Sequence, residues 1–442
     1  MNEIKIEKYS SYKDSGVDWL GEVPSHWEVW PGLSFIFENK DRNKGMKRNT
    51  VLSLSYGNIR VKLEDELTGL VPESFETYQF VNKGDLIFRP TDLQNDIVSL
   101  RSSISEYEGI ITNAYLNLRF TSKANSKFFH YFFRAIDNNK IIYGLGSGLR
   151  QNISYLDFRR FQFPFPPIPE QTSIAAFLDR KTALIDQAVG IKQKQIELLK
   201  ERRQILIHKA VTRGLNPNAK LKDSGVEWIG QMPESWEVKR LKEFCKAFGR
   251  IGFRGYTTSD LVSEGEGAIT ISPSNIKGEF MTFEKCSYLS WNKYHQSPEI
   301  QIFEDDILMV KTGSTFGKTG IVKTPPQEAT VNPQLIVLKE IKINSDYFYN
   351  LLKTSMVQYQ VQTEVIGSTI PTISETKILN FKVALPQKSE MEEILKYIET
   401  TTAKIATAIS LKEQEIEKLK EYKATLINSA VTGKIKVGNY DK

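Results

Sequence analysis

Asp223 to Val238 reads DSGVEWIGQMPESWEV, and this stretch decides how the chain is organised because an earlier stretch repeats it. The earlier copy, DSGVDWLGEVPSHWEV, spans Asp14 to Val29 and begins 209 residues before the second. Asp, Ser, Gly, Val, Trp, Gly, Pro, Trp, Glu and Val recur in the same order and spacing. A period this long indicates duplicated domains, since solenoid repeats have periods of about 20–50 residues. We therefore expect two copies of one structural unit.

The composition is that of an ordinary soluble protein. At roughly 100–200 residues per domain, the length suggests about two to four domains. No apolar run reaches the ~18 residues that a membrane span needs, and the N-terminal MNEIKIEKYS is too polar for a signal peptide. Two cysteines, Cys245 and Cys286, favour a reducing cytoplasm. The net charge of +6 is compatible with nucleic-acid binding but does not demonstrate it.

Each copy of the repeat heads a region of short strands. Trp19 and Trp27 are expected to pin the N-terminal segment onto a core. The first region has strand-like segments, a helix and a glycine-rich loop at Val51–Ser55, Asp85–Phe88, Ile110–Leu118, Ser126–Ile136 and Tyr143–Ile153. Pro164–Pro169 reads as an extended linker. The second region has strands and a glycine-rich loop at Ala268–Ile271, Asp306–Val310, Leu335–Leu338 and Ile366–Ile373.

A long helix is predicted after each region. The first spans Glu170–Val211 and stops at Gly214, and the second begins at a capping box formed by Ser389 and Glu392. Apolar residues follow a seven-residue register in both helices, with an offset of 220. The first helix has Leu178, Ile185, Val189, Ile196, Leu199 and Leu206, and the second has Ile398, Ile405, Ile409, Ile416, Leu419 and Leu426.

The two seams are expected to pair as an antiparallel coiled coil, because an isolated helix with one apolar seam is marginal in water. Lys192 and Lys412 fall on matching seam positions. They would then act as polar positions that set the register. The alternative is that both lysines extend outward into solvent without a specific role.

The sequence matches known catalytic motifs only weakly. Gly313–Thr319, GSTFGKT, resembles a phosphate-binding loop, with Lys318 and Thr319 as the residues that an ATPase would use. Its glycines are one residue too close, and the sequence that follows reads as a strand instead of a helix. The four histidines are scattered, neither cysteine has a CxxC partner, and no nuclease carboxylate–lysine cluster is present. Asn332-Pro333 continues with Gln334, unlike an adenine-methylating signature. A binding protein is favoured.

Polar loops predict DNA recognition in both halves. Arg can read guanine and Gln or Asn can read adenine, whereas lysines and hydroxyls usually contact phosphate and sugar. The candidates in the first half are Arg60, Arg89, Asp92, Gln94, Asn95, Arg101, Arg150 and Gln151. Those in the second half are Lys277, Lys311, Thr312, Ser314, Thr315, Lys318, Ser368 and Thr369. Each could instead be a solvated loop residue. Because the helices match while these loops differ, we expect one partner used twice and two different targets.

With these features the chain resembles the specificity subunit of type I restriction–modification systems. The motifs that carry the resemblance are DSGVxWxGxxPxxW at the head of each half, GDLIFRPTDLQND, RQNIS and PPIPEQTSIAAFLD in the first half, and GSTIPTIS and LPQKSEMEEILKYIE in the second. The resemblance covers nearly the whole chain. The second helix entry departs from the first, with Lys388-Ser-Glu-Met in place of Pro169-Glu-Gln.

The resemblance implies an α+β fold with two similar target-recognition domains in a pseudo-twofold arrangement, separated by two long helices in an antiparallel coiled coil. The expected segments are recognition domains at 1–168 and 215–387, spacer helices at 169–214 and 388–435, and a tail at 436–442. The helix seams would support subunit docking, chiefly through Leu178, Ile185, Lys192, Leu199 and Leu206 and through Ile398, Ile405, Lys412, Leu419 and Leu426.

The resemblance also implies a function without catalysis in this chain. Each recognition domain would bind half of a split double-stranded DNA site, and the helices would set the gap. Two methyltransferase subunits, which use S-adenosylmethionine, and restriction/translocase subunits, which use ATP and Mg²⁺, would be the partners in the cytoplasm. The chain itself would hold no cofactor and no metal. Two alternatives stay open, a phosphate-loop ATPase and a symmetric protein scaffold with no DNA role.

Overall fold

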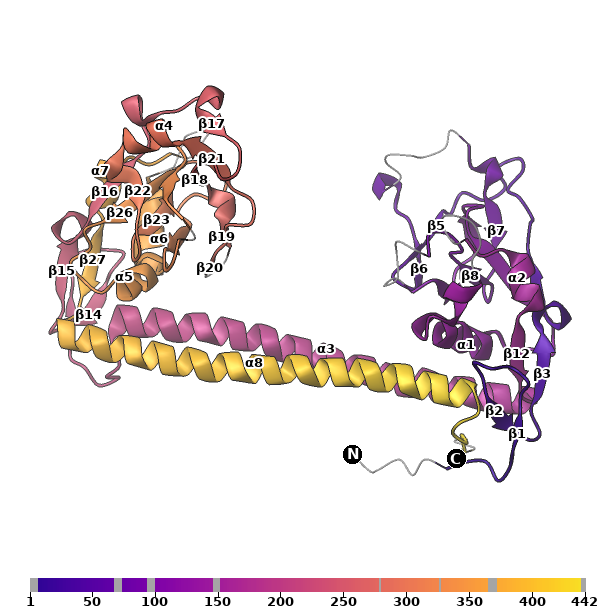
Figure 1. The fold of residues 1–442 in the computed structure, drawn as a ribbon. Coiled ribbons are helices and arrows are strands. Elements are labelled where there is room, and N and C mark those ends of the chain that lie inside the picture. Colours follow the sequence, from indigo (N-terminus) through magenta and orange to yellow (C-terminus); the bar gives the residue numbers. More distant parts are fainter. Residues whose placement is uncertain are drawn as a thin grey trace. The chain divides into compact units, whose positions relative to one another are not determined.

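The computed structural model describes residues 7–66, 74–93, 100–145, 152–277, 280–325, 327–364 and 372–438. The chain divides into two units (Figure 1): unit 1 is Met1–Lys194 with Lys412–Lys442, and unit 2 is Gln195–Leu411. Each unit combines a strand-rich region with about half of each long helix, α3 (Ile168–Arg213) and α8 (Lys388–Val431). The predicted mixed α and β fold class is confirmed.

Unit 1 is built around a four-stranded antiparallel sheet in the order β4-β11-β8-β9. Helix α1 packs near β9, and its phenylalanines fill the core between the sheet and the long helices. The elements of the strand-rich region are β1 (Tyr12–Asp14), β2 (Glu22–Pro24), β3 (Glu28–Pro31), β4 (Ile36–Glu38), β5 (Leu52–Ser55), β6 (Asn58–Val61), β7 (Gln79–Val81), β8 (Leu86–Phe88), β9 (Ser102–Ile104), β10 (Gly109–Ile111), β11 (Leu116–Phe120), α1 (Ser126–Asn138), α2 (Tyr155–Arg160) and β12 (Gln162–Phe165).

Unit 2 repeats the plan with the antiparallel sheet β16-β26-β23-β24 and adds a five-stranded sheet, β17-β21-β18-β25-β22. Its elements are β13 (Leu221–Asp223), β14 (Gln231–Pro233), β15 (Glu237–Arg240), β16 (Lys246–Gly249), β17 (Leu261–Val262), β18 (Gly267–Ile271), β19 (Ile276–Lys277), β20 (Phe280–Met281), β21 (Ser287–Ser290), α4 (Trp291–His295), β22 (Gln301–Ile302), β23 (Ile307–Val310), β24 (Thr319–Ile321), β25 (Ala329–Val331), β26 (Leu335–Lys339), α5 (Ser345–Leu352), α6 (Ser355–Thr363), α7 (Glu375–Leu379) and β27 (Lys382–Leu385).

The repeated tryptophan motif closes the junction between each strand-rich region and the helix ends. Trp27 is fully buried in the unit 1 core, together with Ala430 and Val431 at the end of α8. Trp236 is fully buried in the unit 2 core with Val211, and its Nε1 donates a hydrogen bond of 3.1 Å to Glu390. The prediction that the motif anchors a segment onto a core is confirmed, and both helix ends take part in that anchoring.

In both units the long helices run in opposite directions. Within unit 1, Asp186 binds Lys423 at 2.6 Å and Lys192 binds Glu415 at 2.5 Å. Residue numbers therefore increase along α3 in the direction in which they decrease along α8. Within unit 2, Arg203 and Thr402 line one cavity, and Gly214 lies against Glu390. Leu178, Ile185 and Ile196 on α3 and Ile398, Ile405, Ile416 and Leu426 on α8 are buried. The predicted seams are therefore the packed faces of these helices.

Lys192 and Lys412 converge on one carboxylate. The Nζ atoms lie 2.5 Å and 3.0 Å from Oε2 of Glu415, and hydrogen bonds from the two lysines, that of Lys192 first, hold the Glu415 pKa below its usual value. The lysines therefore do not simply extend into solvent. That they set the register stays a prediction.

Three local predictions are wrong. Ile110–Leu118 is not one strand, because the chain turns between β10 and β11. Pro164–Pro169 is not a free linker, because β12 pairs with β3 and α3 already begins at Ile168. Ser389 is not a cap, because α8 begins at Lys388 and places it inside the first turn. Gly214 does follow the end of α3 and has a left-handed φ of 72°, as expected of a helix stop.

Candidate nucleic-acid interface

In unit 1 the two loops predicted to recognise DNA lie against each other. The first leaves β8 at Arg89, and the second ends at Asn152 and Ile153. The Ile153 amide donates to the Pro90 carbonyl at 2.9 Å, and the Asp92 amide donates to Asn152 Oδ1 at 3.1 Å. The two candidate loops therefore form one surface. Gln94, Asn95, Arg150 and Gln151 lie outside the described residues.

Unit 2 makes the equivalent contact with different side chains. The Ile373 amide donates to the Lys311 carbonyl at 3.0 Å, and Thr372 Oγ1 lies 3.3 Å from Thr312 Oγ1. This contact joins the loop after β23 to the residues that follow the second glycine-rich segment. Ser368 and Thr369 lie outside the described residues. The same backbone hydrogen bond thus holds the two loops together in each half.

An acid–base pair supports the start of the central strand in each sheet. Asp85, just before β8, accepts two hydrogen bonds from Arg119 on β11, at 2.9 Å and 3.0 Å. Asp306, just before β23, binds Lys339 on β26 at 2.7 Å. Burial raises the pKa of Asp306 although Lys339 opposes this shift. The pairs fix the strands whose ends carry the candidate loops.

The candidate residues differ in how accessible they are. Ser314, Thr315, Arg60 and Lys277 are exposed, and Arg89, Asp92, Thr312 and Lys318 are partly buried. Arg60 forms an ion pair with Glu66, and Lys277 lies 3.9 Å from Glu284. Exposed cations at these places suit contacts to phosphate more than a fixed reading of bases.

Arg101 and Lys311 point into the protein. The Arg101 side chain is fully buried, and its guanidinium donates to the carbonyls of Thr91 at 2.7 Å and Asp92 at 3.1 Å. It therefore shapes the candidate loop, and its position does not support the predicted base contact. Lys311 is also buried, and burial lowers its pKa. Its position does not support a phosphate contact.

The phosphate-loop alternative is wrong. Residues 311–318 connect the antiparallel strands β23 and β24, whereas a phosphate-binding loop connects a strand to a helix N-terminus. The loop is closed by backbone hydrogen bonds between Val310 and Lys318 and between Gly317 and Val310. Thr319, the residue that would bind Mg²⁺ in such a site, is buried in β24.

The sequence interpretation missed a recurring turn in front of Arg60 and Lys277. Ser55-Tyr-Gly-Asn-Ile-Arg60 and Ser272-Pro-Ser-Asn-Ile-Lys277 share Ser, Asn, Ile and a basic residue at identical spacing. The first is the tip of the β5–β6 hairpin, and the second leads from β18 into β19. The repeated spacing was the available signal. It shows that Arg60 and Lys277 occupy matching positions.

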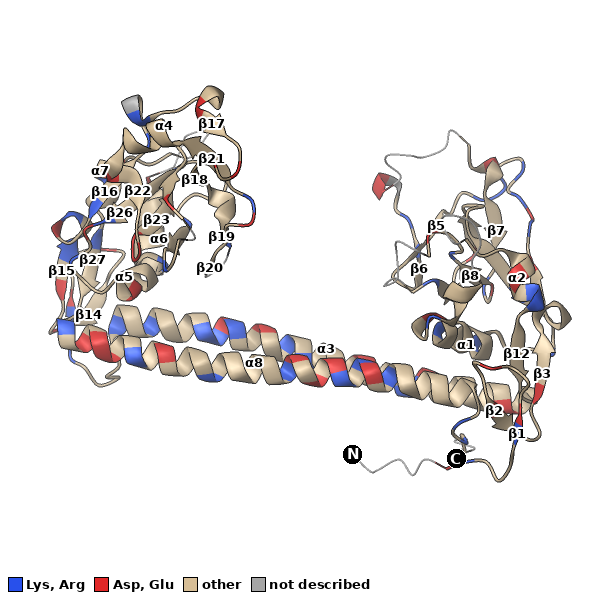
Figure 2. Ribbon diagram, viewed as in Figure 1, with Lys and Arg blue, Asp and Glu red and all other residues tan. Residues whose placement is uncertain are grey.

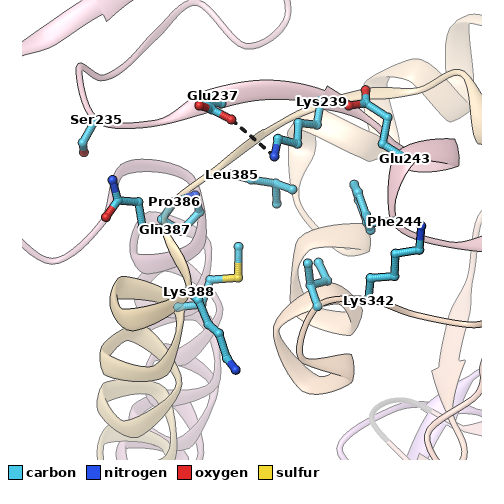
Figure 3. A pocket seen from close by; sticks show the side chains of 12 residues that line it. Ser235, Glu237, Lys239, Glu243, Phe244, Lys342, Leu385, Pro386, Gln387 and Lys388 are labelled. Atoms are coloured by element: carbon cyan, nitrogen blue, oxygen red, sulfur yellow. Dashed lines mark ion pairs between the residues drawn. The ribbon is translucent and has the colours of Figure 1, made fainter.

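The cavities carry no common chemistry. In unit 2 a cavity of about 510 Å³ lies beside β15 and the entry to α8 (Figure 3), and Glu237 and Lys239 form an ion pair of 3.3 Å at it. Unit 1 has a cavity of about 410 Å³ at the matching place, beside Glu28, Trp30 and Lys123. Their linings differ, with stacked Trp30 and Phe165 in one and several lysines in the other. No shared catalytic grouping follows from them.

The distribution of charged and potential metal-binding side chains also gives no indication of a shared catalytic grouping in the described residues. Figure 2 shows basic and acidic residues interspersed along α3 and α8. Within the described ranges, no group of three or more His, Cys, Asp or Glu side chains could hold a metal ion. No helix in that part of the chain is long and apolar enough to cross a membrane.

A family model matches most of the chain. The model, described as the type I restriction modification DNA specificity domain, matches residues 59–200 and 233–421. The MjaVIII specificity subunit of a type I restriction enzyme from Methanocaldococcus jannaschii is 26% identical over 287 residues, 64% of each chain. A putative MjaX specificity subunit from the same organism is 24% identical over 432 residues, covering 95% of this chain and 96% of that one. The first alignment spans just under two thirds of that relative.

Two solved structures share the fold. A chain from a type I R-M system, whose structure addresses complex assembly and conformational transition, aligns with a TM-score of 0.64 at 15% identity, covering 92% of this chain and 98% of that one. The HsdS subunit from Thermoanaerobacter tengcongensis aligns with a TM-score of 0.54 at 13% identity, covering 93% and 98%.

Proposed function

We propose, because the chain belongs to the type I restriction modification DNA specificity family, that it is the DNA sequence-specificity subunit of a type I restriction–modification enzyme. It binds a bipartite, asymmetric double-stranded site, with one half-site on the loop surface of each unit. The chain itself is non-catalytic and holds no cofactor. Its place of action is the cytoplasm, where chromosomal and invading DNA meet the enzyme.

The observation that carries this proposal is the equivalent loop contact in the two units. A backbone hydrogen bond joins Ile153 to Pro90 in one unit and Ile373 to Lys311 in the other. A fixed backbone contact with different surrounding side chains allows two different base sequences to be read on one framework. A scaffold that bound one protein twice would have no need for dissimilar loops at these positions.

The partners in this proposal are two methyltransferase subunits and the restriction/translocase subunits. S-adenosylmethionine would bind to the former, and ATP with Mg²⁺ to the latter. Beyond its packed seam, the part of α3 in each unit has a pair of apolar side chains seven residues apart and between 46% and 54% exposed, Leu184 and Ile191 in unit 1 and Leu198 and Ile205 in unit 2. A seven-residue spacing keeps the two side chains of a pair on one side of the helix. We assign these pairs to methyltransferase docking, because the packed seam does not use them.

The proposal predicts that a duplex with both half-sites binds more tightly than any duplex with a changed gap. Inserting one base pair rotates one half-site by roughly 35° about the DNA axis. The affinity should therefore fall by at least about tenfold, a loss comparable to that of a mismatched base pair. Binding would be measured by fluorescence anisotropy with the chain in complex with its methyltransferase, at several salt concentrations. Equal affinity for the original, lengthened and unrelated duplexes would contradict the function.

A further inference from the structure

Tyr56 is held in an unfavourable backbone conformation at an exposed hairpin tip. Ser55 pairs with Asn58, so Tyr56 and Gly57 form the two-residue turn between β5 and β6. Their φ angles are +48° and +74°, and a turn with two positive φ angles normally takes Asn-Gly, Asp-Gly or Gly-Gly. A large side chain at its first position costs free energy, of the order of 1 kcal/mol. The turn therefore adopts a backbone conformation that a tyrosine at its first position disfavours.

Packing of the tyrosine side chain does not offset this free-energy cost. It is 84% exposed, and within the described part of the chain its ring makes no stacking contact and its hydroxyl no hydrogen bond. A strained, exposed residue is a reason to look for function, because a structural role would bury it.

The backbone of the tip is braced from behind. Arg134 on α1 donates a hydrogen bond of 2.7 Å from Nη2 to the Gly57 carbonyl. Gly57 also packs so closely on Leu100 that a Cβ there would lie 2.7 Å from the Leu100 side chain. Arg134 is partly buried, and burial lowers the pKa of its guanidinium. The hairpin thus presents the tyrosine ring on a fixed support.

The matching turn of unit 2 has no such ring. Pro273 and Ser274 stand in the places of Tyr56 and Gly57, within a short 3-10 turn. There, Asn275 Oδ1 accepts hydrogen bonds from the Ser272 amide at 2.8 Å and the Ser272 hydroxyl at 2.9 Å. The unit 2 turn is therefore held by its own side chains and exposes no aromatic side chain. The exposed ring belongs to one half of the duplicated protein.

We propose that Tyr56 stacks on a base face of the half-site that unit 1 binds, at a base step opened in the complex. Every base has a π-face, so an aromatic ring can stack without reading a particular base. Arg60, exposed on the adjoining strand β6 and ion-paired with Glu66 in the free chain, would exchange that carboxylate for a neighbouring phosphate. Asn58, also exposed, lies between them in sequence. This inference rests on the proposed DNA-reading function and adds an asymmetry to it, because the matching turn of unit 2 carries no ring.

Tyr56→Asn separates a DNA-contacting role from a structural one. Asn-Gly is the preferred sequence of this turn, so the variant should have an unchanged or higher Tm. Loss of base stacking should weaken binding to the bipartite duplex by about 5- to 100-fold. Tyr56→Phe keeps the ring and should bind within about twofold of the wild-type protein. Opposite directions of stability and affinity in one variant are not expected of a merely structural residue.

The readout is the fluorescence of 2-aminopurine, placed in turn at each position of both half-sites. The protein is the full chain in complex with its methyltransferase. Besides the adenine positions that the methyltransferase flips out of the duplex, wild-type and Tyr56→Phe protein should change the fluorescence at one position of the unit 1 half-site, and Tyr56→Asn should abolish that change alone. If Tyr56→Asn binds as tightly as wild type, or loses stability together with affinity, the inference is overturned. If wild-type protein shows no preference for the bipartite duplex, the proposed function itself fails.

Discussion

Replacing Arg101 with alanine is expected to erase base discrimination at the half-site of unit 1 while leaving the other half-site unchanged. The guanidinium fixes the loop after β8 through the carbonyls of Arg89, Thr91 and Asp92, at 3.4, 2.7 and 3.1 Å. Losing hydrogen bonds from a buried charged group costs roughly 3 kcal/mol. Because that cost falls on one loop, the loop should lose its fixed shape before the unit unfolds.

The measurement is the affinity for duplexes that each carry one substituted base pair. The wild-type protein should lose about tenfold or more at every specified pair, in keeping with 1–3 kcal/mol per mismatch. With Arg101→Ala, substituted base pairs in the unit 1 half-site should no longer lower the affinity, whereas those in the other half-site should lower it as in the wild type. Arg250 supplies the matched control, because it is also buried and binds the Val331 and Arg254 carbonyls and Thr330 Oγ1 in unit 2. Arg250→Ala should affect only the other half-site. If Arg101→Ala changes both responses alike, separate reading by the two units is wrong.

Trp27→Ala is expected to destabilise unit 1 by about 3–5 kcal/mol, the usual cost of removing a large buried aromatic side chain. Trp27 is fully buried, and its ring lies 6.4 Å from that of Phe128 and 6.0 Å from that of Tyr9. Removing it opens a cavity where the strand-rich region, α3 and the end of α8 meet. The loss should fall mainly on unit 1, because unit 2 has its own core around Trp236.

Thermal and urea unfolding would test this expectation. Wild-type protein should unfold with closely spaced transitions, and Trp27→Ala should shift one of them downward. Trp236→Ala should shift the other. Trp228 of the second repeat copy is 37% exposed, so Trp228→Ala provides a control with a loss of about 1 kcal/mol or less. A Trp27→Ala protein as stable as this control would show that the repeated motif does not anchor the junction.

Features set by local pattern were predictable from the sequence. The repeat, both long helices, their buried seams and α1 follow from periodicity and spacing. Helix α1 is capped by Asn125, whose Oδ1 accepts hydrogen bonds from the amides of Lys127 and Phe128, a local arrangement that a sequence reveals. These elements depend on residues a few positions apart, so tertiary contacts did not change the predicted secondary structure.

Features set by distant contacts were not predictable. The turn that splits Ile110–Leu118 is held by Gln79, whose Nε2 donates to the carbonyls of Thr112 at 3.2 Å and Tyr115 at 2.7 Å. Arg101 reads as an exposed loop residue, yet its amide binds Asp137 on α1 at 2.9 Å and its side chain turns inward. No local pattern indicates either contact, because both partners lie more than 30 residues away.

The candidate site was predictable as two loops per half but not as individual contacts. The convergence of the loops depends on a hydrogen bond between Pro90 and Ile153, which only the folded chain brings together. A role for Tyr56 could not be predicted from the sequence, because an isolated tyrosine in a turn belongs to no motif. The base contacts predicted for Gln94, Asn95, Arg150 and Gln151 and the phosphate or sugar contacts predicted for Ser368 and Thr369 stay predictions.

The most direct test of separate half-site reading is the pattern of methylated adenine in DNA from a host that expresses this chain with its methyltransferase. Methylation-sensitive sequencing should return one split motif, with two specified half-sites at a fixed gap. The same experiment with Arg101→Ala should return a motif in which one half-site is degenerate and the other, with the gap, is intact. A single continuous motif, or loss of both half-sites together in the variant, would contradict the account.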